Sequence, residues 1–99
     1  MALIDDIKAA LRVTSPKMDA EVQSLIDAAI ADMKRVGVRD SLVEQDSITG
    51  LPKMAVVLYC KANFGYDNSE ADRFMDSYRE TVVSLMNSTA YNSSYGDGS

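Results

Sequence analysis

Few side chains in this sequence could carry out chemistry. Histidine, the commonest general base and the commonest transition-metal ligand in proteins, is absent. The single cysteine, Cys60, lies in an almost wholly apolar run that begins at Met54. A thiol in apolar surroundings has a raised pKa and packs as a small hydrophobic side chain. We therefore interpret Cys60 as a structural residue and not as a nucleophile.

Two pairs of carboxylates could share a proton or bind a hard cation: Asp5 with Asp6, and Asp76 with Glu80. A solvated helix face carries such pairs without any chemical role, and we favour that interpretation. The acidic stretch 67–72 has the general composition of a calcium-binding loop. However, its sixth position is an aspartate where the loop needs glycine, and its twelfth is a tyrosine where the loop needs a bidentate glutamate. Helix capping explains this stretch better.

Phosphate binding is also poorly supported. The glycines are isolated or lie at the end of the chain, so no phosphate-binding loop is present. Lys34, Arg35 and Arg39 form a basic cluster that could contact a phosphate or an acidic neighbour, but a helix C-terminus attracts cations by itself. The formal charge of −5 and the pI near 4.5 argue against tight binding to nucleic acid. The residues thus predict no enzyme, no metal and no cofactor.

The apolar pattern predicts two helices in the first half of the chain. Residues 3–11 place their leucines and isoleucines on one face and their aspartates in the first turn, where carboxylates meet the positive end of the helix dipole. Pro16 cannot lie inside a helix, so the first helix must end before it. Residues 19–36 follow a regular helical period, with acidic residues at the start, basic residues at the end, and Gly37 as a stop signal.

Two more helices are predicted in the second half. Pro52 suits a first helical position, and the third helix runs from there to about Phe64. Its middle is apolar on every side, which predicts that it is the central element. Ser69 and Asp72 resemble a capping box that starts the fourth helix. The apolar stripe of the fourth helix comprises Ala71, Phe74, Met75, Tyr78, Val82, Leu85 and Met86.

Methionines recur on these apolar stripes. We interpret four of them as core residues and not as an adaptable binding surface: Met33, Met54, Met75 and Met86.

Two segments lack a sustained helical period. Residues 38–50 are predicted to form a structured loop, with one helical turn over 41–45. Residues 89–99 are too polar and glycine-rich to pack by themselves, and we expect a flexible tail there. Tyr91 and Tyr95 are candidate partner contacts within it, because tyrosines in a polar segment are plausible interface anchors. This tail is expected either to become ordered only on meeting a partner or to stay disordered with no role.

The predicted fold is therefore all-α. A small four-helix domain covers residues 1–88, with a structured loop between helices two and three, and a flexible polar C-terminal tail covers residues 89–99. With 99 residues the chain can build only a modest core, so neighbouring subunits could supply further burial.

The sequence also bears on the compartment. No stretch approaches the roughly 20 consecutive apolar residues that span a bilayer, and the start of the chain lacks the basic head of a signal peptide. One cysteine cannot form an internal disulfide and suits a reducing environment. We expect a protein that is neither exported nor inserted in a membrane, and that belongs to a bacterial cytoplasm or to a particle assembled there.

The order of these signals resembles the small head–tail connector, or adaptor, proteins of tailed bacteriophages. The first helix ends in Leu11-Arg12-Val13-Thr14, which is similar to the end of the first helix in that family. Residues 19–29 begin with acidic side chains and are similar to the family's second helix. Leu51-Pro52 opens an apolar helix that carries Tyr59. The resemblance covers residues 3–64.

This resemblance implies a structural virion protein that forms a homo-oligomeric ring between the portal protein and the tail or stopper protein. The ring would extend the DNA channel, and DNA would pass through it without specific binding. The implied location is the head–tail interface of the virion, after assembly in the host cytoplasm, with no membrane partner. A ring needs two different contact surfaces on each subunit, and the apolar third helix could contribute to one.

Two other interpretations stay open at this point. Helix bundles host many functions, so the chain could be a small helical protein-binding module of a bacterial or phage complex. It could also be an enzyme subunit whose site is completed across chains, although the missing histidine and motifs make that a remote alternative.

Overall fold

The structure is a computed structural model that describes residues 3–64 and 69–87. Within these ranges the chain forms four α-helices: α1 (Leu3–Leu11), α2 (Asp19–Val36), α3 (Gly50–Asn63) and α4 (Ala71–Asn87). Two short 3₁₀ turns, η1 (Pro16–Met18) and η2 (Asp40–Leu42), lie in the connections. The prediction of an all-α, four-helix protein is confirmed.

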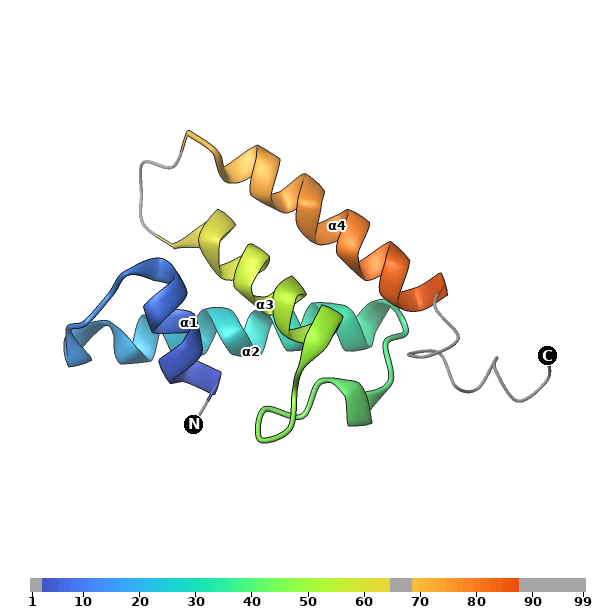
Figure 1. The fold of residues 1–99 in the computed structure, drawn as a ribbon, viewed down its shortest axis with the longest axis horizontal. Helices are drawn as coiled ribbons and strands as arrows, with labels where there is room; N and C mark the ends of the chain where they lie inside the picture. Colours follow the sequence, from blue (N-terminus) through green and yellow to red (C-terminus); the bar gives the residue numbers. More distant parts are fainter. Residues whose placement is uncertain (1–2, 65–68, 88–99) are drawn as a thin grey trace.

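Helix α3 is the central element, as its apolar sequence predicts. It packs against each of the other three helices, most extensively against α4. Figure 1 shows α3 and α4 side by side and running in opposite directions, with α2 crossing behind α3 and the short α1 beside it. Every helix therefore turns its apolar face toward α3 or toward a neighbour of α3.

The core is a single cluster of apolar side chains from all four helices and the loop after α2. Its most completely buried large side chains are Ile7, Val22, Ile26, Met33, Val43, Val56, Cys60 and Leu85. Because the cluster draws on the loop as well as the helices, the domain closes around one core.

The loop between α2 and α3 is structured, as predicted. Val38, Val43 and Ile48 are buried in the core. Outside the core, Gln45 accepts a hydrogen bond from the side chain of Gln23 and donates one to Asp27, each at 3.0 Å, and so ties the loop to α2. The helical turn within the loop covers 40–42 and starts one residue before the predicted 41–45.

Ion pairs fix α1 to its neighbours. Lys8 contacts Asp19 at the start of α2 at 2.5 Å, and Lys53 of α3 contacts Asp6 at 2.6 Å. Both pairs are partly buried, so they are less screened by solvent than ordinary surface pairs. They hold a short helix whose own length would not stabilise it.

Helices α1 and α2 end in the same way. After α2, the amide of Gly37 donates to the carbonyl of Lys34, and the amide after it donates to Met33. After α1, Arg12 and the residue after it make the equivalent two bonds. This pair of hydrogen bonds is the Schellman motif, which needs one residue with backbone dihedral angles in the left-handed region. Gly37 has φ of 113°, and Arg12 has φ of 61°.

Three predicted details are wrong. Helix α3 begins at Gly50 and not at Pro52, because proline is tolerated throughout the first turn. Helix α4 begins at Ala71, and the amide of Phe74 donates to the carbonyl of Glu70, so the predicted start at Ser69 is too early. Met54 is 54% exposed and is not a core residue, because an all-apolar helix in so small a domain has one side left uncovered.

The two helix ends generate a paired prediction. Arg12→Gly should raise the free energy of unfolding by up to about 1 kcal/mol, because glycine adopts positive φ without steric cost. Gly37→Ala should lower the free energy of unfolding by about 1 kcal/mol or more. An alanine is strained at the positive φ of this position, and its Cβ would lie 3.1 Å from Cε of Met86. Urea unfolding followed by circular dichroism measures both. A destabilised Arg12→Gly would show that the Arg12 side chain makes compensating contacts.

Candidate functional site

A concave groove of about 700 Å³ lies between α2 and α4. Tyr59 of α3 reaches into it from between the two helices. The other lining residues are Asp32, Arg35, Val36, Met75, Tyr78, Arg79, Val82, Val83, Met86 and Asn87. The groove therefore has an apolar interior and two arginines among its polar residues.

Apolar side chains remain open to solvent in this groove. Val36 is 41% exposed and Val83 is 57% exposed. Val36 belongs to the apolar stripe that predicts α2, but it lines the open groove and is not covered by α4. Of the methionines interpreted as core residues, Met33 is buried, whereas Met75 and Met86 are only partly buried and line the groove.

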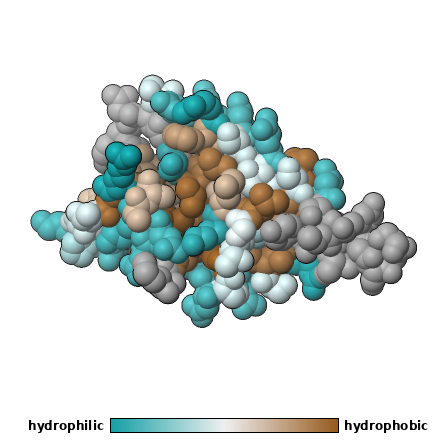
Figure 2. Space-filling model, viewed as in Figure 1, coloured by the Kyte–Doolittle hydropathy of each residue, from teal (hydrophilic) through white to brown (hydrophobic). Residues whose placement is uncertain are grey.

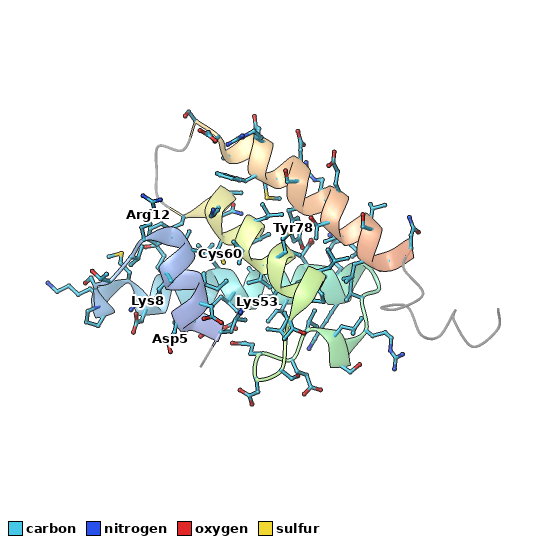
Figure 3. All side chains as sticks on the ribbon, viewed as in Figure 1. Asp5, Lys8, Arg12, Lys53, Cys60 and Tyr78 are labelled. Atoms are coloured by element: carbon cyan, nitrogen blue, oxygen red, sulfur yellow. The ribbon has the colours of Figure 1, made fainter. Side chains whose placement is uncertain are left out.

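A polar contact joins α2 to α4 beneath the groove. The hydroxyl of Tyr78 donates to Asp32 at 2.7 Å, and Arg35 donates to the other carboxylate oxygen at 2.6 Å. The rings of Tyr78 and Tyr59 meet edge to face with centroids 5.2 Å apart. Figure 3 shows Tyr78 directed from α4 toward α3. One tyrosine thus connects three helices.

This contact shifts the pKa of both partners. Burial acts to raise the pKa of Asp32, but the hydrogen bonds from Arg35 and Tyr78 and the charges of Arg35 and Arg79 outweigh it, so the pKa lies below its ordinary value of 3.8. Burial, and then the hydrogen bond to Asp32, raises the pKa of Tyr78. Asp32 is therefore an anion and Tyr78 a neutral donor at neutral pH, which is the combination that the hydrogen bond requires.

The residues that could do chemistry are not brought together. Cys60 is fully buried in the core, and burial raises the pKa of its thiol to about 12. Asp6 pairs with Lys53, and Asp76 lies 3.5 Å from Arg79. One carboxylate of each pair, Asp6 and Asp76, therefore takes part in an ion pair between helix-surface side chains.

All three residues of the basic cluster, Lys34, Arg35 and Arg39, are exposed. Arg35 also lines the groove and binds Asp32. Among the described residues no group of three potential metal ligands lies close enough to hold an ion. No described helix is long and apolar enough to cross a bilayer.

Sequence reasoning missed the groove and the Asp32–Tyr78 contact. The two residues are 46 positions apart, and no spacing rule relates them. One signal was present: a tyrosine on an apolar stripe needs a partner for its hydroxyl once the ring is buried. Tyr91 and Tyr95, the candidate partner contacts, lie outside the described residues.

Comparison with known families identifies the kind of protein. A family model described as phage connector protein matches residues 3–92, which is nearly the whole chain. The chain belongs to the phage connector protein family. This agrees with the resemblance seen in residues 3–64 and extends it through α4. No curated protein and no solved structure matches the connector. Because the family is structural, an interaction surface is the relevant kind of site on this connector, and the groove is its strongest candidate among the described residues.

The contact between α2 and α4 is testable by a double-mutant cycle. Tyr78→Phe keeps the ring but removes the donor, so it should lower the free energy of unfolding at neutral pH by about 1 kcal/mol. The same substitution made in an Asp32→Asn background should cost less, because the charged acceptor is already gone. Equal costs in both backgrounds, measured by urea unfolding, would mean that the two side chains are not energetically coupled.

The lowered pKa of Asp32 predicts that the free energy of unfolding depends on pH. The folded-state pKa of Asp32 is lower than its unfolded value, so its contribution is fully present above the unfolded pKa and is lost as pH falls through the folded pKa. Between about pH 5 and about pH 2.5, the wild-type connector should therefore lose more stability than Asp32→Asn does. Urea unfolding at both pH values gives the difference, and parallel losses in the two proteins would contradict the assignment.

Proposed function

We propose that this connector is a structural virion protein that forms a ring between the portal protein and the tail or stopper protein. It extends the DNA channel at the head–tail interface of the virion, after assembly in the host cytoplasm, and it catalyses no reaction. The observation that carries the proposal is the family match over residues 3–92. The alternative, a small helical protein-binding module, predicts a monomer or dimer.

The surface of α3 supports a contact between copies. Leu51, Met54, Val57 and Leu58 recur at helical spacing, so they share one face of the helix. Met54 is 54% exposed, and the other three are only partly buried. Figure 2 shows hydrophobic side chains over α3, bordered by hydrophilic margins. An apolar stripe on the central helix suits burial against a second copy.

A closed ring requires two different surfaces on each subunit, because its contacts run head to tail. The connector has two separate apolar regions: the outer stripe of α3 and the groove between α2 and α4. Met54 lies on the first and is not among the lining residues of the second. These two apolar surfaces therefore meet the minimal requirement for a head-to-tail assembly.

The charge of the chain supports passage of DNA without binding. The formal charge is −5, and the exposed loop after α2 carries Asp40, Glu44 and Asp46. Acidic side chains repel phosphate, so a channel wall built from them lets DNA slide past. Tight binding of duplex DNA to the assembled ring at physiological salt would contradict this part of the proposal.

The ring is tested with purified connector and purified portal. Electron microscopy and light scattering should show rings of connector on the portal. Met54→Lys should weaken their formation at least about tenfold, because it places a charge in the buried contact. Its unfolding midpoint should match the wild type, which shows that the variant is folded. A stable dimer that does not bind the portal protein would instead identify a protein-binding module.

A further inference from the structure

The groove between α2 and α4 opens beside the point where the described chain ends. Asn87, the last residue of α4, is itself part of the groove wall, and Met86 precedes it there. Val36 and Val83 expose apolar surface in the same groove. Residues 88–99 therefore start at the rim of an open apolar surface.

The length of this segment fits the groove. The wall that α4 contributes runs from Met75 to Asn87, which is about 18 Å at 1.5 Å per residue. An extended chain covers about 3.3 Å per residue, so about six residues span that wall. If residues 88–90 reverse the direction of the chain, Tyr91 can lie beside the last turns of α4, near Val83. Tyr95 then lies about 13 Å farther along.

The chemistry of the segment fits as well. Residues 88–99 hold Tyr91 and Tyr95 but no lysine or arginine, and they include Asp97. The groove offers apolar walls for the tyrosine rings and has Arg35 and Arg79 beside them. Arginine stacks favourably on an aromatic face and also attracts a carboxylate. A tyrosine keeps its hydroxyl in water while its ring is buried.

We propose that residues 88–99 dock into the α2–α4 groove of their own chain, with Tyr91 and Tyr95 as the anchors. The same chain is the favoured source because the segment is tethered at the groove rim. A short flexible tether gives an effective concentration in the millimolar range, which exceeds that of other copies in a dilute solution. Docking covers Val36 and Val83 in the isolated chain.

The test uses the isolated full-length connector and needs no portal, so it is independent of the proposed ring. Val83→Lys introduces a charge into the groove at a position that is already exposed, and it should release the segment. Chymotrypsin cleaves after tyrosine, so cleavage at Tyr91 and Tyr95 should become at least about tenfold faster. Ser84→Lys is the matched control, because Ser84 is also exposed on α4 but does not line the groove. It should leave the cleavage rate unchanged.

Isotope-filtered NMR identifies the source of the segment. In a uniformly labelled sample, the ring protons of Tyr91 and Tyr95 should show contacts to the methyl groups of Val36 and Val83. In an equal mixture of labelled and unlabelled chains, contacts between the two populations should be absent. Equal cleavage rates in the wild type and both variants would overturn the proposal. Contacts between labelled and unlabelled chains would overturn it too, since they assign the groove to a second copy.

Discussion

The burial of α3 is the constraint on which the rest of this connector depends. A helix that is apolar on nearly every side must be surrounded, and burying one large aliphatic side chain is worth about 1.5–3 kcal/mol. Helices α1, α2 and α4 all pack against it. In a chain of 99 residues they do not suffice to cover it, and Met54 stays in solvent. The same feature therefore builds the domain and leaves an apolar surface.

The position of α4 follows from the same shortage of covering elements. Helix α4 packs along α3 and meets α2 chiefly near its end, where Met86 approaches Gly37. Tyr78 bridges the gap by donating to Asp32, so a polar contact fixes the angle between two helices that share little apolar surface. What remains open is the groove, with its exposed valines. Its presence is thus a consequence of how three helices surround one.

Much of the fold could be predicted from local signals. Gly37 acts on its own backbone, so the end of α2 is readable from the sequence, and Pro16 requires α1 to end somewhere before it. The apolar composition of α3 correctly predicts a central helix. Composition could not show which side of that helix stays exposed, and so Met54 was wrongly placed in the core. The groove was invisible for the same reason, because it arises from the packing angle of distant segments. The acidic and cysteine residues, in contrast, could be interpreted from their immediate neighbours.

A cryo-EM map of the connector bound to portal is the most direct measurement of the role assigned to this chain. It should show a closed ring in which the stripe of α3 around Met54 is buried against the next subunit. A map with separate connector copies, each with this stripe facing solvent, would contradict that role.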